Sequence, residues 1–231
     1  MIYQEPSHLI ELSEKHFSET FWVTKKGYRK LENGRGASIV FNLDDRKYVL
    51  RKFLRGGLIA NFLYDSYLWL GLSRSRVFNE CLILEHAQKE QVLVPKFVAY
   101  HLERRGLFYS QSIITQFIEN RGTLAEVLNR RELSRAEWKL LADSIKAMHK
   151  ASINHVDLNA NNILYGNNDR FYIIDFDKAQ VMPDKNGWPQ KNVDRLLRSL
   201  QKESPKYLDY QQSEFLKQEL GALYDSVTAK I

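Results

Sequence analysis

The chain has 231 residues, 44% of them hydrophobic and 27% charged, which is enough for one large domain or two small lobes with a real core. A single cysteine excludes an internal disulfide framework. We find neither an N-terminal signal pattern nor a run of about 20 apolar residues that would cross a bilayer, so we expect a cytoplasmic or peripheral membrane protein. The formal net charge of +6 favours an anionic partner, whether nucleotide, nucleic acid or acidic lipid.

The first part of the chain predicts a small antiparallel sheet. Residues 21–23, Phe-Trp-Val, have the composition of a short strand. Gly34 and Gly36 then precede two β-prone runs joined by a turn. These three segments are residues 37–41, 42–45 and 47–53. The second run carries Arg51 and Lys52 side by side, and strand alternation puts them on opposite faces of the sheet.

Two helices are expected next. Residues 56–73 are rich in large apolar and aromatic side chains and predict a helix. This helix is expected to pack on the sheet. Alternatively, because basic residues flank it on both sides, it contacts an anionic bilayer. Residues 75–88 predict a second helix, which carries Glu80 and Glu85 and buries Cys81 as a small core residue.

Further strands and helices follow. The strands are expected at residues 92–100 and 107–117, and the helices at residues 122–128 and 134–151. In the last helix Ser134 is the expected N-cap, and Glu137 completes a capping box with it. The buried stripe of that helix is expected at Trp138, Leu141, Ile145 and Met148.

The helix leads into residues 155–164, His-Val-Asp-Leu-Asn-Ala-Asn-Asn-Ile-Leu. Phosphotransferases need a carboxylate that receives or orients the proton of the acceptor hydroxyl, and a nearby amide oxygen that holds Mg²⁺. Asp157 and Asn162 have the spacing for these two roles, catalytic and metal-binding. A short apolar strand then ends at Asp175, which we expect at the same metal ion.

The last expected element is an amphipathic helix over residues 190–203, which follows a break at Trp188 and Pro189. Its apolar side comprises Val193, Leu196, Leu197 and Leu200. Its basic side comprises Lys191, Arg195, Arg198 and Lys202. This basic side is either a solvated face or a contact to anionic lipid or to phosphates of the substrate.

The segment 155–164 and the run 171–177, Phe-Tyr-Ile-Ile-Asp-Phe-Asp, resemble the catalytic and metal loops of the protein-kinase-like fold. The resemblance implies an α+β, two-lobed fold. An antiparallel-sheet N-lobe would span residues 1–118 and a mainly helical, shortened C-lobe residues 119–231. Together the lobes would form one kinase-like domain that uses ATP and Mg²⁺.

The same resemblance assigns roles in nucleotide binding. Arg51 would grip the phosphates where protein kinases carry a lysine, with Lys52 as the alternative, and Glu80 rather than Glu85 would pair with this cation. Backbone groups of a glycine loop and of the hinge between the lobes would contact the phosphates and the adenine. These further candidates are Gly34, Gly36, Gln116 and Ile118. The loop lacks the third glycine of a kinase, so an ordinary hairpin is its alternative.

Several departures from protein kinases narrow the class. Val156 replaces the arginine of regulated kinases, and Asn159 replaces the lysine usually found two residues beyond the aspartate. Residues 178–231 are too few for the segments that position a protein substrate, so the acceptor is expected to be a small-molecule or glycan hydroxyl. His155 is expected to hold the loop's backbone. Asp177 adds a metal ligand or binds a basic neighbour, and the sequence does not choose.

Within this class the sequence resembles the 3-deoxy-D-manno-octulosonic acid (Kdo) kinase family of Gram-negative bacteria, in the lipopolysaccharide kinase superfamily. Its most specific segments are Arg-Lys-Phe-Leu-Arg-Gly-Gly at 51–57 and Arg-Leu-Leu-Arg-Ser-Leu at 195–200. The resemblance implies ATP-dependent phosphorylation of the 4-hydroxyl of Kdo on a lipid A precursor. It also implies a peripheral location on the anionic surface of the inner membrane, at its cytoplasmic face.

Two alternatives stay open. One is a kinase for another lipopolysaccharide sugar or an aminoglycoside-like small molecule. The other is a catalytically inactive, nucleotide-binding kinase-like module, which the missing glycine and strand lysine favour slightly. We find no nucleic-acid-binding motif and expect no nucleic-acid partner. The sequence leaves the oligomeric state open.

Overall fold

The computed structural model describes residues 1–8, 10–31, 38–53, 67–184, 186–203, 215, 216, 218 and 219. The chain divides into two compact units. The first comprises Met1–Leu82 and Pro95–Phe117, and the second comprises Ile83–Val94 and Ile118–Ile231. An antiparallel sheet dominates the first unit, and the longer helices α4 and α5 lie in the second. The expected α+β class, with an antiparallel sheet in one unit and the longer helices in the other, is confirmed.

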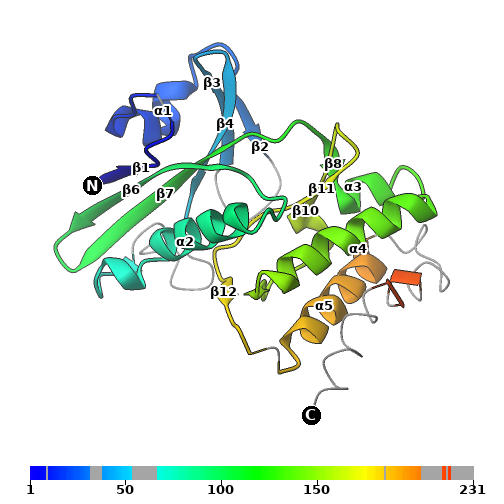
Figure 1. Ribbon diagram of the computed structural model, residues 1–231. Coiled ribbons are helices and arrows are strands. Elements are labelled where there is room, and N and C mark those ends of the chain that lie inside the picture. Colours follow the sequence, from blue (N-terminus) through cyan, green and yellow to red (C-terminus); the bar gives the residue numbers. More distant parts are fainter. Residues whose placement is uncertain are drawn as a thin grey trace. The chain divides into compact units, whose positions relative to one another are not determined.

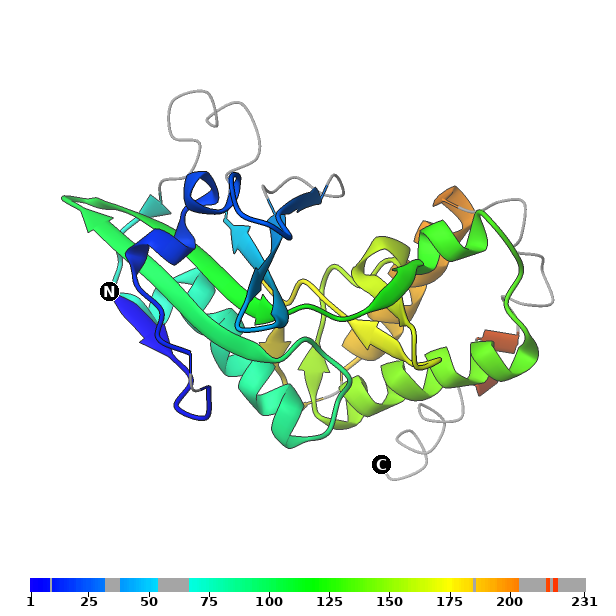
Figure 2. The ribbon, with the colours of Figure 1, turned by 90° about the horizontal axis from the view of Figure 1, so that it is seen from above.

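The sheet of the first unit has the strand order β1-β6-β7-β4-β3-β2, with β5 also paired to β7. Its strand pairs within the described residues are antiparallel, and the long strands β6 and β7 run side by side in both views (Figure 1, Figure 2). The bounds are β1 Ile2–Gln4, β2 Arg29–Leu31, β3 Ser38–Leu43, β4 Arg46–Lys52, β5 Tyr67–Leu68, β6 Phe97–Arg105 and β7 Phe108–Gln116.

The predicted hairpin over residues 37–53 is confirmed as β3 and β4. Its turn residues Asp44 and Asp45 have φ angles of 47° and 60°. Two consecutive left-handed residues twist a two-residue turn in the sense that paired strands require, and aspartate tolerates this conformation. The β3–β4 register pairs Ser38 with Arg51, so the hairpin fixes the position of Arg51 along the sheet.

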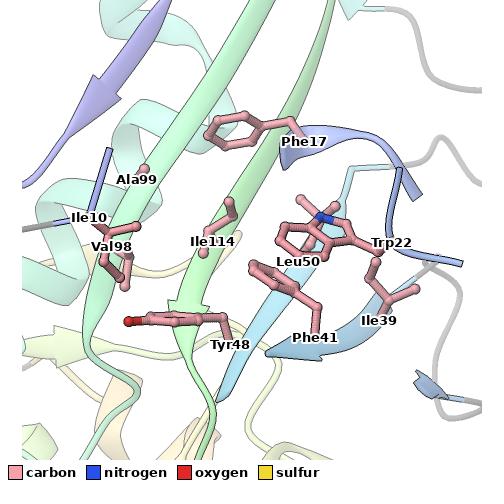
Figure 3. Close-up of a cluster of buried hydrophobic side chains, with 10 residues drawn as sticks. All are labelled: Ile10, Phe17, Trp22, Ile39, Phe41, Tyr48, Leu50, Val98, Ala99 and Ile114. Atoms are coloured by element: carbon pink, nitrogen blue, oxygen red, sulfur yellow. The ribbon is translucent and has the colours of Figure 1, made fainter. Parts of the chain in front are cut away.

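An aromatic and aliphatic cluster forms the core on one face of this sheet (Figure 3). Its members are Ile10, Phe17, Trp22, Ile39, Phe41, Tyr48, Leu50, Val98, Ala99 and Ile114. The predicted strand at residues 21–23 is wrong, because α1 (Glu19–Trp22) is a helix there, preceded by a 3₁₀ turn at Glu14–Phe17. The Trp22 ring stacks on Phe41 at 4.0 Å between centroids, and its Nε1–H donates to the His16 carbonyl. This tertiary packing overrides the β-propensity of the aromatic residues.

The expected helix over residues 56–73 lies mostly outside the described residues. At its end the prediction is wrong, because Tyr67–Leu68 is the strand β5 on β7, followed by a 3₁₀ turn at Leu72–Arg74. The next helix is confirmed as α2 (Arg76–Lys89), with Cys81 buried. The buried Gln111 side chain accepts from the N–H of Val77 at 3.0 Å, which ties the start of α2 to β7.

The second unit combines helices with two small antiparallel sheets. Its helices are α3 (Leu124–Leu128), α4 (Arg135–Lys150) and α5 (Trp188–Glu203). Its strands are β8 (Asn120–Thr123), β9 (Ile153–Asn154), β10 (Ile163–Gly166), β11 (Phe171–Ile173) and β12 (Gln180–Val181), paired as β11-β10-β8 and β12-β9. The capping box at Ser134 and Glu137 is confirmed, as is the buried stripe of α4. The segment 155–162 therefore lies between β9 and β10, with α4 leading into it.

Helix α5 begins two residues earlier than predicted, so the expected break at Trp188 and Pro189 is wrong. Proline is tolerated there because the N–H groups of the first turn have no partner within the helix. The buried Trp188 fixes this end, since its Nε1–H donates to the Asp184 carbonyl at 2.7 Å. The predicted apolar side is buried, and the predicted basic side is exposed. Within the described ranges no helix is long and apolar enough to span a bilayer.

Candidate active site

Hydrogen bonds within the loop that follows β9 hold the backbone of Asp157. The Asp157 carbonyl accepts from the side-chain amide of Asn159 at 2.8 Å and from that of Asn162 at 3.0 Å. Asn159, where a protein kinase has lysine, thus shapes the loop. The Asn162 amide nitrogen is committed to the Asp157 backbone, so its amide oxygen is the group suited to bind a cation.

Two hydrogen bonds join this loop to the segment that follows β11. The N–H of Ile174 donates to the Asn162 carbonyl at 2.9 Å, and Nε2 of His155 lies 3.0 Å from the Ile174 carbonyl. The His155 side chain therefore holds the backbone at Ile174, a structural role of the kind expected for it. Asp175 follows Ile174 directly, so the structure brings the three predicted residues Asp157, Asn162 and Asp175 to two hydrogen-bonded neighbouring loops.

Asp175 has an uncommon backbone conformation. Its φ is 63°, in the left-handed region that aspartate tolerates better than most side chains, and the residue is exposed. Phe176, directly after it, is buried, with its ring centroid 4.9 Å from that of His155. A buried aromatic next to an exposed aspartate fixes the turn, and strained backbone of this kind concentrates at functional sites.

The environment of the His155 ring disfavours its charged form. The residue is only 1% exposed, and burial lowers its pKa. The charges of Asp175 and Asp157 act in the opposite direction and raise that pKa, although burial outweighs them.

Helix α5 binds the same loop through three polar side chains, of which only Arg195 was singled out from the sequence, as part of the basic side of the helix. Asn192 accepts from the His155 N–H at 3.1 Å and donates to Oδ1 of Asn154 at 2.9 Å. One turn later Arg195 donates to Oδ1 of Asp157 at 3.1 Å, and after another turn Ser199 accepts from the Ala160 N–H at 3.0 Å. Spacings of three and four residues place these side chains on one helical face. That periodicity was the available signal.

In the first unit, Arg51 of β4 forms the predicted ion pair with Glu80 of α2. The Glu80 side chain is only 4% exposed, and the Arg51 guanidinium lies over the Phe53 ring at 4.5 Å. Lys52 instead lines a shallow hollow with Ser18, Glu19, Thr20 and Val23. Of the described residues that line this hollow, only Lys52 was a candidate for the site, as the alternative to Arg51. Of the two adjacent cations, Arg51 is therefore the one that Glu80 positions.

The predicted hinge spans the boundary between the units, which falls between Phe117 and Ile118. The N–H of Gln116 donates to the Lys96 carbonyl at 2.8 Å, and the Ile118 carbonyl accepts from the side chain of Asn120 at 2.7 Å. These bonds fix the backbone around Gln116 and Ile118, where we expect the contact with adenine. Gly34 and Gly36 lie outside the described residues.

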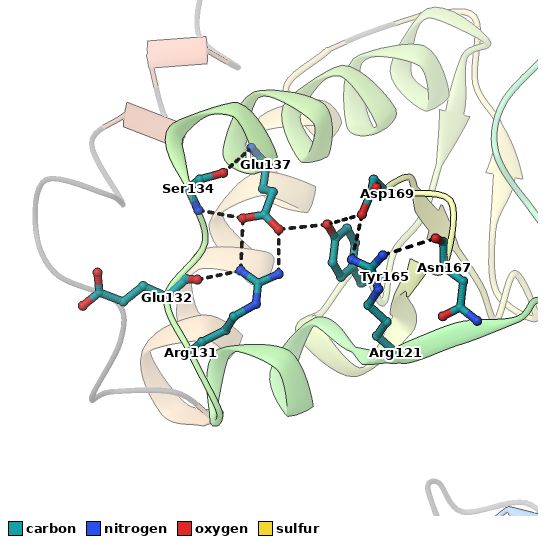
Figure 4. Close-up of polar contacts among 8 residues, drawn as sticks. All are labelled: Arg121, Arg131, Glu132, Ser134, Glu137, Tyr165, Asn167 and Asp169. Carbon is teal, nitrogen blue, oxygen red and sulfur yellow. Dashed lines mark hydrogen bonds and ion pairs between the residues drawn. The ribbon is translucent and has the colours of Figure 1, made fainter.

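A polar cluster fixes the start of α4 to the hairpin of β10 and β11, which the catalytic and metal loops flank (Figure 4). Arg131 donates to Glu137 at 2.6 and 3.1 Å, and the hydroxyl of Tyr165 lies within 2.9 Å of the carboxylates of Glu137 and Asp169. The hydrogen bonds from Arg131 are the main reason why the pKa of Glu137 falls to about 2. Burial raises the pKa of Tyr165 to about 12.

The described residues contain no group of three or more His, Cys, Asp or Glu side chains that could hold a metal ion. Mg²⁺ in phosphotransferases usually binds through one or two protein ligands, with substrate phosphates and water completing its shell. The donor set of Asn162 and Asp175, an amide oxygen and a carboxylate, fits an ion that arrives with a nucleotide.

Residues 19–224 match the model of the family described as "Lipopolysaccharide kinase (Kdo/WaaP) family". Similar curated proteins are named 3-deoxy-D-manno-octulosonic acid kinase. That of Photobacterium damsela subsp. piscicida is 36% identical over 206 residues, 89% of this chain and 85% of its own. That of Vibrio cholerae serotype O1 is 32% identical, covering 88% and 83%. That of Stenotrophomonas maltophilia (strain K279a) is 36% identical, covering 80% and 73%.

Proposed function

This chain belongs to the lipopolysaccharide kinase (Kdo/WaaP) family, and from that premise we propose that it transfers the γ-phosphoryl group of ATP to the 4-hydroxyl of Kdo on a lipid A precursor. The chain is thus a kinase of lipopolysaccharide core biosynthesis. The observation that carries the proposal is the joining of the loops of Asp157, Asn162 and Asp175 by side-chain and backbone hydrogen bonds. Phosphoryl transfer needs little covalent chemistry from a protein and depends on such positioning.

In the proposed mechanism Asp157 orients the sugar hydroxyl and accepts its proton as the new oxygen–phosphorus bond forms. Its carboxylate is 47% exposed, as contact with an incoming acceptor requires. Asn162 and Asp175 hold Mg²⁺. When bound, this ion supplies positive charge that neutralises the β- and γ-phosphates.

The nucleotide roles of the first unit belong to the same proposal. Arg51, positioned by Glu80, contacts the nucleotide phosphates. Backbone groups of Gly34 and Gly36 approach the phosphates, and those near Gln116 and Ile118 contact adenine. In this proposal residues 1–118 serve the nucleotide, and residues 119–231 carry the catalytic and metal loops.

A glycolipid acceptor suits the short path between the metal loop and α5. Protein kinases position a peptide with a long activation segment and further helices beyond this loop. Here α5 already begins at Trp188, shortly after Asp177, and its polar face binds the catalytic loop. Helix α5, which follows Asp177 closely, therefore supports the catalytic loop.

We place this activity peripherally at the cytoplasmic face of the inner membrane, where the acceptor would lie in an anionic surface. The basic side of α5 supports this location, since Lys191, Arg198 and Lys202 are exposed. Salt-sensitive co-sedimentation with anionic liposomes is the expected result. If the protein did not bind anionic liposomes at low salt, the proposed location would be wrong, but the proposed phosphoryl transfer would be unaffected.

The test is an assay of radiolabelled phosphate transfer from ATP to Kdo-bearing lipid A precursor, with and without Mg²⁺. Asp157→Ala should lower kcat by several orders of magnitude. Asp143→Ala is the matched control, because this exposed carboxylate of α4 pairs only loosely with Lys146 at 3.7 Å. If phosphate were transferred only to another sugar, Kdo would be the wrong acceptor. If the protein bound ATP but transferred phosphate to no glycolipid, it would be a catalytically inactive module.

A further inference from the structure

The guanidinium of Arg195 forms an ion pair with the Asp157 carboxylate, which receives the proton of the acceptor hydroxyl in the proposed mechanism. Its Nη1 donates to Oδ1 of Asp157 at 3.1 Å, and the two side chains are 50% and 47% exposed. The sequence places Arg195 among four basic residues of α5, which share a face of the helix. Only for Arg195 among these four do the described contacts include the catalytic loop.

This contact is built into the fold. Asn192, three residues before Arg195, and Ser199, four residues after it, bond the same loop from the same helix. Asn192 is 3% exposed, so its two hydrogen bonds are shielded from water. Because helix and loop are fixed on both sides of the ion pair, α5 presents a cation to Asp157 in a defined register. An isolated exposed ion pair would lack this property.

The catalytic loop has no cation of its own. Residues 155–162 contain neither lysine nor arginine. Asn159 stands two residues beyond the catalytic aspartate, where a protein kinase has a lysine, and its side chain is engaged with backbone groups at Asp157 and Asn161. Negative charge is spread over the phosphoryl oxygens during transfer, and a fixed cation beside them stabilises it.

We propose that Arg195 is a catalytic residue, the cation that α5 supplies to the transferred phosphoryl group. This inference rests on the proposed phosphoryl transfer. One oxygen of the Asp157 carboxylate is bonded to the guanidinium, and the other accepts the proton of the acceptor hydroxyl. A guanidinium has five N–H donors, enough to bond Asp157 and a phosphoryl oxygen together.

The step balances without a change at the arginine. The acceptor oxygen forms a bond to the γ-phosphorus, the bond from that phosphorus to the bridging oxygen breaks, and ADP leaves. The hydroxyl proton passes to Asp157, and Arg195 neither gains nor loses a proton in the step. A lysine at this position would keep the charge but lose the planar, two-sided donor geometry.

Arg195→Gln and Arg195→Lys test the proposal, with Lys139→Gln as the control, because it removes an exposed positive charge of α4 that has no role in the proposed site. In the glycolipid assay we expect Arg195→Gln to lower kcat by about 100-fold or more, with the KM values for ATP and acceptor changed less than about threefold. Arg195→Lys should recover part of kcat, and the control should match the wild type.

A second measurement separates contact with the phosphoryl group from an indirect effect on Asp157. ADP with aluminium fluoride and Mg²⁺ mimics the transferring phosphoryl group without an acceptor. Arg195→Gln should bind this mixture at least about tenfold more weakly while binding ATP like the wild type. The proposal would be overturned if Arg195→Gln bound ADP with aluminium fluoride as tightly as the wild type does. It would also be overturned if the variant raised only the KM for the acceptor. A wild type that transfers nothing would instead refute the proposed function.

Discussion

Replacing Asn192 by alanine should destabilise the protein and disable its catalytic loop. The change removes the acceptor of the His155 N–H at 3.1 Å and the donor to the Asn154 side chain at 2.9 Å. All three residues are at least 93% buried, so water cannot easily replace the lost bonds. Each buried group left without its partner costs about 1–3 kcal/mol, and we expect a total loss of about 3 kcal/mol.

Urea unfolding followed by far-ultraviolet circular dichroism measures this loss, and phosphate transfer measures the effect on kcat. For a chain of this length the melting temperature should fall by about 6–12 °C. Asn192→Asp should be at least as destabilising, because it buries a carboxylate beside the Asn154 oxygen. Gln190→Ala, an exposed change on the same helix, should stay within about 0.5 kcal/mol. A loss below about 0.5 kcal/mol for Asn192→Ala would refute the structural role assigned to α5.

Three further predictions concern charged and titratable groups. Arg51→Met removes an ion-pair partner of the buried Glu80 carboxylate, so it should lower the free energy of unfolding by about 3 kcal/mol and weaken ATP binding; an unchanged melting temperature would contradict the role of the pair. Because Arg131 lowers the pKa of Glu137 from 4.5 to about 2, Glu137→Gln should cost about 3 kcal/mol at pH 7, and this difference should shrink as pH falls from 4.5 towards 2. Burial lowers the pKa of His155, so stability should fall as the pH drops through the ordinary histidine value of about 6.5, where the unfolded chain takes up the proton first. A ¹⁵N NMR titration should show the His155 ring titrating below that value, and titration at or above it would contradict the buried environment.

Local signals in the sequence predicted much of the fold. The turn at residues 42–45, the capping box of Ser134 and Glu137 and the apolar stripe of α4 are each encoded within a few neighbouring residues. The pairing of Arg51 with Glu80 followed from strand alternation and the kinase-like pattern. Where the sequence misled, tertiary packing decided the conformation: Trp22 joins the aromatic core from a helix, and Trp188 anchors the first turn of α5.

The support of the catalytic loop by α5 could not be predicted with the same ease. Arg195 and Asp157 are 38 residues apart, and no short motif joins them. The polar residues at 192, 195 and 199 border the apolar stripe of α5, and their periodicity becomes informative only once the packing surface of the helix is known. Asp175 shows the converse case, since its position at the end of an apolar run was predicted and its left-handed backbone was not.

The most direct test of the account is the fate of γ-phosphate from labelled ATP when the purified chain meets a membrane-presented glycolipid ending in Kdo. The account predicts that label appears on the sugar as an alkali-stable monoester at the 4-position. It also predicts that the label disappears with Asp157→Ala but persists with Asp143→Ala. Equal labelling by the wild type and Asp157→Ala would contradict the central role of this carboxylate.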